Sequence, residues 1–347
     1  MKFFSVTLAL FIPLFSLAAI FTVDNSSSSP GQYTSFTAAY NVASAGDTIY
    51  VRGSLHTYGS ISIKKKIILI GSGYNPSPAN TYPTLFDDID IIRSGGTTNG
   101  SGTEIYGVKV KSSGDINISG SSYSGYLSNV RIERCEAYVK SYRINGLKLI
   151  NNILKVFIGS GTGGNSVVYN NIIKSVDFYN TYYANSLTFD HNVFTDAAAS
   201  AFRHCIVKNS IFYGTTPGNS VSSTAFSNNM SYASANDTFD ITTNSSSGFN
   251  NQSHTNPNFV SVSSTLYNYF NDYHLQSGSP AINASSDGTN MGIYGGLYPF
   301  PIGGTSGSGF QTSQEPVAPQ IYEYTIQNNI IQPSDTLHIN VKVSIQK

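Results

Sequence analysis

The densest group of residues that could carry out acid–base chemistry is a short acidic run, Asp87, Asp88 and Asp90. Hydrolysis of a glycosidic bond needs two carboxyl groups about 5 to 9.5 Å apart, and carboxylate oxygens also bind Ca²⁺. We therefore take these three residues as the candidate catalytic group. A solvated loop between two strands explains the same run and is the simpler interpretation. Nothing else in the sequence supports a Ca²⁺ site or any other cofactor.

The histidines are weaker candidates. Asp190 and His191 resemble a catalytic dyad, because a carboxylate can orient an imidazole that acts as a base. However, His191 falls in a slot that recurs along the chain and is elsewhere occupied by residues such as Arg134, Asn151 and Asn170. That pattern favours an ordinary surface position for His191, with Asp190 in a surface ion pair with Lys208 of the next turn. The other histidines do not have the spacing of metal ligands, so no metal site is predicted.

A set of aromatic and basic residues points to binding. Tyrosine stacks on sugar rings while its hydroxyl forms hydrogen bonds, and lysine and arginine attract anionic groups. One column recurs at a single slot and consists of Tyr138, Lys155, Lys174, Thr195 and Tyr213. Further basic residues in the same part of the chain are Arg131, Arg134 and Arg143. The column predicts a binding site for polysaccharide or a cell-surface glycan. An ordinary strand face is also consistent with it, and the chain has no Trp.

These residues are carried by a short repeat. Its pattern is apolar or small, any, apolar, any, polar, small polar, and it occurs at 130–135, 147–152, 166–171, 187–192, 205–210 and 224–229. The last positions are separated by 17, 19, 21, 18 and 19 residues. Propeller blades need about 40 residues each, and the consensus of leucine-rich repeats is not visible. The pattern therefore predicts an all-β, single-stranded right-handed parallel β-helix, in which each turn lays its strands on those of the turn before.

The last position of each repeat predicts a ladder of small polar side chains. Its occupants are Cys135, Asn152, Asn171, Asn192, Ser210 and Asn229. An amide at a bend can bond its neighbours about 4.8 Å above and below. Cys135 and Cys205 lie in the first and fifth aligned turns, about 19 Å apart by that spacing, whereas a disulfide needs Cα atoms within about 7 Å. We predict two free, buried thiols.

The N-terminus has the composition of an export signal. Lys2 precedes an almost wholly apolar run, and Ser16-Leu17-Ala18 supplies small residues for cleavage. We expect a secreted protein, extracellular or at the cell surface, with no membrane-spanning segment after cleavage. The 19 basic residues balance the 19 acidic ones, so the charge gives no reason to expect a nucleic-acid partner. A monomer is expected.

Two sets of motifs resemble a known group of proteins. Ala45-Gly-Asp-Thr-Ile-Tyr-Val51 is similar to the start of the first coil in secreted pectin-lyase-like β-helices, where a short helix, here within Tyr33–Val42, covers the N-terminal end. Four later segments are similar to the closing coils of exported bacterial β-helix proteins, including choice-of-anchor Q domain proteins. They are Asn256–Val260, Asp272–Gln276, Gly278–Ile282 and Gly292–Gly296. The resemblance implies fold and export but no single reaction.

The chain is predicted to have four parts. They are a signal peptide at 1–18, the β-helix at 19–301, a linker at 302–320 and a short β-rich tail at 321–347. The favoured function is a secreted, non-catalytic β-helix that binds polysaccharide or a cell surface. The first alternative is a polysaccharide lyase or glycoside hydrolase acting on an acidic polysaccharide, and the second is a structural surface protein or adhesin. The aligned repeats place no acids at the same slot in consecutive turns, which weighs against catalysis.

Overall fold

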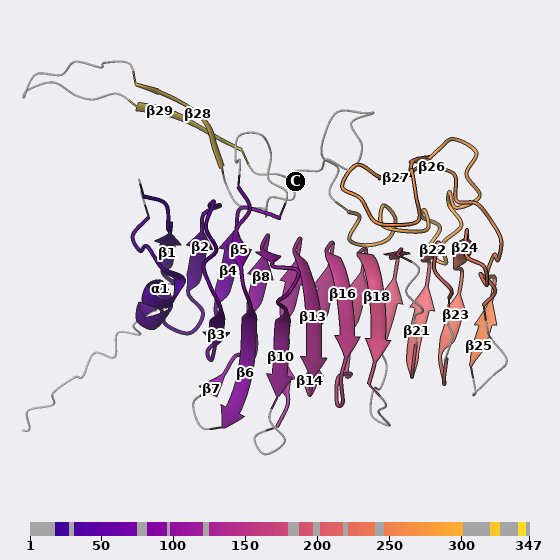
Figure 1. The fold of residues 1–347 in the computed structure, drawn as a ribbon, viewed down its shortest axis with the longest axis horizontal. Coiled ribbons are helices and arrows are strands. Elements are labelled where there is room, and N and C mark those ends of the chain that lie inside the picture. The colour runs from indigo at the N-terminus through magenta and orange to yellow at the C-terminus, as the bar shows by residue number, and fades with distance from the viewer. Residues whose placement is uncertain are drawn as a thin grey trace, which may run out of the picture.

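The chain is a parallel β-solenoid (Figure 1), which confirms the predicted fold class. The computed structural model describes residues 18–27, 31–74, 82–95, 98–120, 125–179, 187–196, 202–217, 221–239, 246–300, 320–326 and 339–344. Most of the predicted signal peptide and linker lies outside these residues. Within them, no helix has the length and apolar character needed to cross a membrane.

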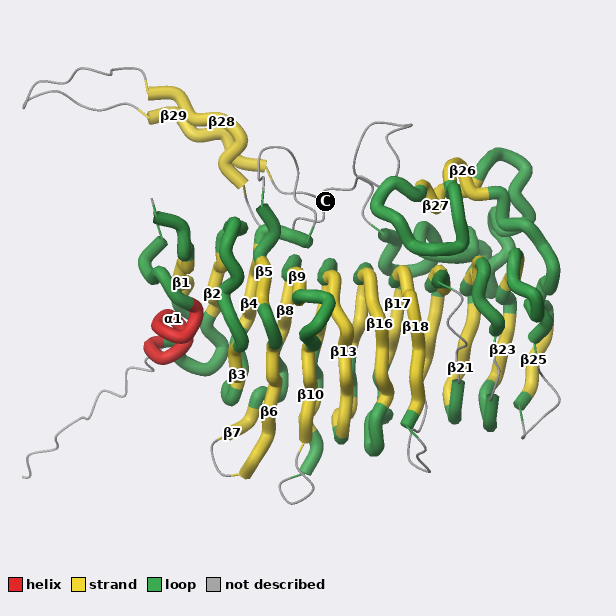
Figure 2. Tube along the Cα trace, in the orientation of Figure 1, coloured by secondary structure: helices red, strands yellow, loops and turns green. Residues whose placement is uncertain are grey.

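Two long parallel sheets run along the solenoid (Figure 2). Sheet A consists, in order, of β1 (Ile20–Val23), β2 (Thr48–Val51), β4 (Ile68–Gly71), β8 (Glu104–Tyr106), β12 (Arg131–Glu133), β15 (Lys148–Ile150), β17 (Val167–Tyr169), β19 (Leu187–Asp190), β21 (Cys205–Lys208), β23 (Ala225–Ser227) and β25 (Ser247–Phe249). The main path of sheet B consists of β3 (Ile61–Ile63), β6 (Ile89–Gly95), β10 (Ile116–Gly120), β13 (Glu136–Tyr142), β16 (Ile153–Ile158), β18 (Ile172–Phe178), β20 (Val193–Phe194), β22 (Ile211–Tyr213) and β24 (Met230–Tyr232).

Shorter strands complete the coils. In sheet B, β5 (Leu85–Phe86) pairs with β9 (Lys109–Val110), and β7 (Thr98–Asn99) pairs with β6. A third, small sheet joins β11 (Leu127–Ser128) to β14 (Ile144–Asn145). The consecutive strands β3 and β4 belong to different sheets.

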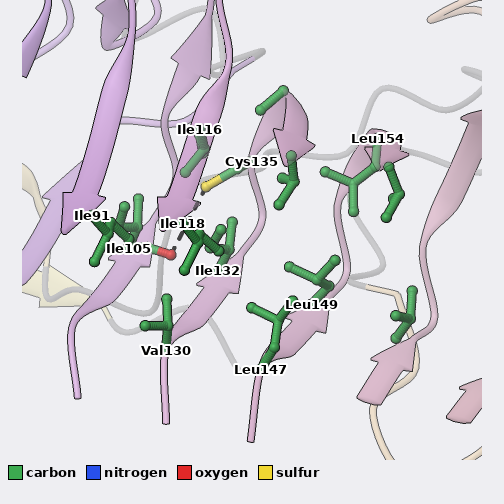
Figure 3. Close-up of a cluster of buried hydrophobic side chains, with 14 of the residues drawn as sticks. Ile91, Ile105, Ile116, Ile118, Val130, Ile132, Cys135, Leu147, Leu149 and Leu154 are labelled. Atoms are coloured by element: carbon green, nitrogen blue, oxygen red, sulfur yellow. Dashed lines mark hydrogen bonds between the residues drawn. The ribbon is translucent and has the colours of Figure 1, made fainter. Parts of the chain in front are cut away.

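Alternation along each strand builds the core. Val130, Ile132, Leu147 and Leu149 are fully buried, as the repeat pattern predicts. Figure 3 shows these side chains together between the coils. Each turn thus removes several aliphatic side chains from water. This burial stabilises the fold by about 25 cal/mol for every Å² of apolar surface.

The corner between sheets A and B imposes a left-handed backbone. The corner residues Arg134, Asn151, Asn170, His191, Asn209 and Asn228 have φ between 52° and 55°. Asparagine tolerates this conformation better than most residues that carry a Cβ. Asparagine therefore suits this corner both because it tolerates the left-handed backbone and because it is polar. The repeat pattern reveals only the preference for a polar residue.

The ladder is confirmed at the next position. Asn171 Oδ1 accepts the backbone N–H of Asn152 at 2.8 Å and its side-chain amide at 2.9 Å, and Asn171 bonds to Asn192 in the same way. The ladder also extends one turn beyond the predicted set, to Asn251.

Cys135 occupies the ladder position among buried aliphatic side chains (Figure 3). Its backbone N–H donates to Asn152 Oδ1 at 2.8 Å. Cys135 and Cys205 are both free and buried, as predicted.

Residues 256–300, here called the C-terminal segment, correct the prediction of closing coils. They contain an antiparallel pair, β26 (Phe259–Ser261) and β27 (Asp272–Leu275), and lie along the flank of the solenoid (Figure 1). Phe259, Tyr273 and Met291 pack there against an apolar outer row. This outer row is formed by the residues that follow the ladder, Ile153, Ile172, Val193, Ile211 and Met230, which are in register on neighbouring strands.

The two ends of the chain bring further elements. Helix α1 (Phe36–Val42) is capped by Ser35, whose Oγ accepts the Ala38 N–H at 3.2 Å, and it contacts β1 and β2. That the helix covers the end of the solenoid stays a prediction. Strands β28 (Gln320–Ile326) and β29 (Ile339–Ser344) form an antiparallel pair, and their docking on the solenoid also stays a prediction.

Candidate functional site

The outer face of sheet B carries an aromatic run. Tyr142 on β13 lies 5.6 Å from Phe157 on β16, and Phe157 lies 6.4 Å from Tyr179, measured between ring centroids. Tyr142 and Phe157 are half-buried, and Tyr179, which follows β18, is 58% exposed. The three side chains point outward because they alternate with the buried Ser141, Ile158 and Phe178. The run therefore crosses consecutive coils with its rings partly open to solvent.

Charged side chains lie beside the aromatic run. Lys140 bonds to Asp115 at 2.7 Å and lies 4.9 Å from the centre of the Tyr138 ring. The hydrogen bond from Lys140 to Asp115 raises the pKa of the ammonium group, so Lys140 stays charged. Lys155 on β16 is exposed and is the strand partner of Tyr138. The face thus combines aromatic rings, cations and a carboxylate.

The predicted column is only partly assembled. Tyr138 and Lys155 are neighbours, but Lys155 pairs with Ser175, because β18 contains an irregularity that shifts the register past Lys174. Lys174 instead reaches Glu136, with its Nζ 3.5 Å from Oε1. The assignment of Lys174 to the column is therefore wrong.

The far end of the column is covered. Thr195 is 2% exposed, and Tyr213 packs against Phe259 of the C-terminal segment with 5.3 Å between ring centroids. The single slot predicted for these residues does not form one open surface. The repeat pattern cannot indicate this, since the covering segment is distant in sequence.

The three predicted arginines do not join this column. Arg131 lies on sheet A and donates from Nε to Glu133 at 2.8 Å. Arg134 is 7% exposed at the corner, with its Nε 3.7 Å from Glu133 Oε1. Arg143 follows β13 at another corner with φ of 49° and is half-buried. Of the three, Arg143 alone follows directly on a residue of the aromatic run, Tyr142.

The acidic candidates are each engaged by a neighbour. Asp87 pairs with Lys111 at 2.5 Å, which lowers the pKa of the Asp87 carboxyl, and Asp90 accepts from Asn117 at 3.1 Å. Asp88 accepts from Ser60 at 2.9 Å and from the backbone N–H of Asp115 at 3.2 Å.

One acidic pair nevertheless shares a slot. Ile89 pairs with Ile116, so the preceding residues Asp88 and Asp115 sit side by side on neighbouring coils. The expectation that no acids match is therefore wrong for these early coils. The aligned repeats begin at residue 130, so they do not include the coils that carry Asp88 and Asp115.

Glu136 is a centre of charge that the sequence does not reveal. Its Oε2 lies 2.9 Å from Lys109 Nζ, and it also accepts from the hydroxyl of Tyr269 in the C-terminal segment. Burial alone would raise the pKa of Glu136, but Lys109, Tyr269 and Lys174 outweigh that effect and hold it below its ordinary value. This network attaches the C-terminal segment to the solenoid.

The interpretation of His191 as a surface residue is wrong. Its side chain is 2% exposed, with Nδ1 2.7 Å from Asp190 Oδ1 and Nε2 3.1 Å from Thr289 Oγ1. Asp287 Oδ2 lies 3.7 Å from Nε2. His191 projects from the corner, as predicted, but the C-terminal segment covers it. The Asp190–His191 pair that resembles a catalytic dyad is therefore a buried contact between the corner and the C-terminal segment.

No group of three or more His, Cys, Asp or Glu residues in the described part of the chain could hold a metal ion. No protein-family model matches this chain. No curated protein sequence matches it either. The geometry of the outer face of sheet B therefore has to carry the functional argument.

Proposed function

We propose that this protein binds polysaccharide, without catalysis, through the outer face of sheet B. The observation that carries the proposal is the aromatic run of Tyr142, Phe157 and Tyr179, with 5.6 and 6.4 Å between successive rings. Partly exposed aromatic rings provide flat apolar surfaces for sugar rings, and tyrosine hydroxyls add hydrogen bonds. Three such rings on successive coils would follow an extended chain of sugars.

Polar groups beside the run would bind the hydroxyls of the same sugars. Asp115 offers acceptors, while Lys140 and Lys155 offer donors. Aromatic and polar groups thus alternate within one flat face, as a ligand with apolar faces and a polar rim requires.

We further propose that the protein is secreted, through the signal peptide at 1–18, and is related to the pectin-lyase-like β-helices. The composition of the N-terminus supports secretion. The Ala45–Val51 motif supports the relationship, because its last four residues form β2 within the first coils. The choice-of-anchor Q resemblance is supported by motif order alone, since the matching segments lie on the flank of the solenoid.

A glycoside hydrolase is the second candidate. The in-register pair Asp88 and Asp115 favours it, since neighbouring parallel strands lie about 4.8 Å apart and retaining glycosidases place their carboxyl groups about 5 to 5.5 Å apart. Both carboxylates are already bonded, Asp88 to Ser60 and Asp115 to Lys140. For this reason binding is preferred to hydrolysis.

The test is a glycan array followed by titration calorimetry on the best polymer, with Tyr142→Ala and Phe157→Ala. Aromatic contacts are worth about 0.5–1.5 kcal/mol, so each change should weaken binding about 2- to 12-fold. Phe249→Ala is the matched control, because Phe249 is 64% exposed but lies on sheet A. Equal affinity in all variants would reject this face, and reducing ends released from any polymer would favour the hydrolase.

A further inference from the structure

The ring at the centre of the aromatic run lies between side chains of opposite charge. Phe157 on β16 is in register with Lys140 on β13 and with Asp177 on β18, and neighbouring strands are about 4.8 Å apart (Figure 1). Lys155 lies two residues before Phe157 and therefore points to the same side of the sheet. A sugar ring stacked on Phe157 would thus have ammonium groups and a carboxylate at its edges.

Two of these charged side chains are not used inside the protein. Asp177 and Lys155 are exposed, and within the described residues neither forms a hydrogen bond or an ion pair. Lys140, by contrast, is bonded to Asp115 at 2.7 Å. A carboxylate only accepts hydrogen bonds and an ammonium group only donates them. Asp177 and Lys155 can therefore bind a donor and an acceptor of one ligand without breaking any bond in the protein.

The charges of the surrounding face nearly cancel. On the part of this face that the C-terminal segment leaves open, the carboxylates are Asp88, Asp90, Asp115 and Asp177. The cations on it or at its edge are Lys64, Arg93, Lys140, Arg143 and Lys155. Among the described residues, five cations minus four carboxylates leave one positive charge, and the adjacent Asp87 and Lys111 cancel as an ion pair. The face therefore has little net charge with which to attract a charged polymer.

The sign of the charge also changes from coil to coil. Asp90 lies on β6, and Asp115 directly precedes β10. Lys140 and Lys155 follow on β13 and β16, and Asp177 lies on β18. A polymer that crosses the coils, as the aromatic run does, would meet both signs along its path. One that carried a single charge on every sugar would be repelled at some of these positions.

We propose that the ligand of this face is a neutral polysaccharide, whose hydroxyls bind Lys155 and Asp177 beside the sugar stacked on Phe157. This inference rests on the proposed glycan binding and adds the class of sugar. A polymer of uronic acids would bring carboxylates to Asp177, and a polymer of amino sugars would bring ammonium groups to Lys155. Uncharged hydroxyls both donate and accept hydrogen bonds, so they complement both side chains.

The test is calorimetric titration of the full chain with polymers of each class, in low and in high salt. The probes are a soluble β-glucan and a galactomannan, which are neutral, polygalacturonate, which is acidic, and a soluble chitosan, which is basic. A neutral polymer should bind most tightly, and its affinity should change less than about twofold with salt, because screening acts on charge pairs that this ligand does not form.

Two variants that each remove one charge give an independent answer. Asp177→Asn and Lys155→Gln should both weaken binding of the neutral polymer about fivefold, because a charged hydrogen bond is replaced by a neutral one. Both side chains are exposed and without protein partners, so both variants should fold. Lys148→Gln is the matched control, because Lys148 is also exposed but lies on sheet A, and it should bind as the wild type does.

The outcomes separate this inference from the proposed function. Tightest binding of polygalacturonate, strengthened by Asp177→Asn and weakened by Lys155→Gln, would overturn the neutral class while leaving glycan binding in place. The reverse pattern with chitosan would do the same. Unchanged affinity in both variants would remove these two side chains from the site. Absence of binding to every polymer would reject the proposed function itself, and this inference with it.

Discussion

Replacement of Asn171 by alanine tests whether the ladder holds the coils together. The Asn171 amide donates to the Leu149 and Tyr169 carbonyls, at 2.9 Å each, and to Asn192 Oδ1 at 3.1 Å. Its oxygen accepts the backbone and side-chain N–H groups of Asn152. Asn171 itself is fully buried, so water does not replace these bonds in the folded protein.

The magnitude follows from the groups left behind. Asn171→Ala leaves the backbone N–H of Asn152 without its partner. It also removes one hydrogen bond from the Leu149 carbonyl and one from the Asn152 side-chain amide, which keeps its bond to the Ile132 carbonyl. Each buried group that loses a bond costs about 1–3 kcal/mol. Partial relaxation of the corner reduces the sum, and a loss of about 3–5 kcal/mol is expected. Asn171→Ser should lose only about half of this. Ser210 shows how a hydroxyl serves in the ladder, since it accepts from Asn192 at 3.0 Å and donates to the Lys208 carbonyl at 2.8 Å.

The assay is urea unfolding followed by circular dichroism, with the loss read from the midpoint at an unchanged m-value. Asn117→Ala is the control, because Asn117 bonds to Asp90 on the outer face and its removal should cost below about 1 kcal/mol. An Asn171→Ala variant that loses no more stability than Asn117→Ala would contradict the role of the ladder. A serine variant as unstable as the alanine variant would contradict it too.

Three other measurements probe separate features. Titration with a thiol reagent should find two free thiols in the unfolded, unreduced protein, and fewer than two would reveal a disulfide. In the folded protein the thiols should react only at strongly alkaline pH, because burial raises the pKa of Cys135 and of Cys205 to about 12. Glu136→Gln should cost about 3–5 kcal/mol at pH 7. The folded-state pKa of Glu136 is lowered, so the wild-type advantage is full above the unfolded value of about 4.3 and disappears as the pH falls through the folded value; parallel stability curves down to acid pH would contradict this. Gly296→Ala should speed limited proteolysis of the C-terminal segment, since its Cβ would lie 2.7 Å from His191 Nδ1 at a φ of 71°, and an unchanged cleavage rate would count against that docking.

The coils could be predicted from the sequence because each turn has the same structural requirements. Alternation decides which side chains enter the core, and the bend requires a small polar side chain. Val130 and Leu147 therefore fall in matching positions, and Cys135 replaces an asparagine where the ladder begins. Because every turn has the same requirements, the sequence carries a regular period that predicts the fold without any structure.

The parts that break the period could not be predicted. One extra residue in β18 displaces Lys174 from the binding column, and a single insertion leaves no mark on a pattern that already varies in length. The apolar residues after the ladder are visible in the sequence, but only the docked segment explains why Ile172 and Val193 face outward. The pairing of Asp88 with Asp115 could not be predicted, because the early coils lack the repeated asparagine that aligns the later ones.

The C-terminal segment changes how such a solenoid should come apart. A stack whose turns contact only their neighbours unfolds in pieces, since each turn is held by nearest-neighbour terms alone. Here one segment bonds to Lys109 and Glu136 near one end of its path and packs on Met230 near the other. The segment therefore links the turns between these two contacts, and those turns should unfold as one cooperative unit. Tyr74, which follows β4, stacks on Tyr269 of the same segment, so the turns before β4 lie outside that span and can fray on their own. Hydrogen exchange should therefore divide the molecule into a slowly exchanging block beneath the segment and a faster N-terminal block.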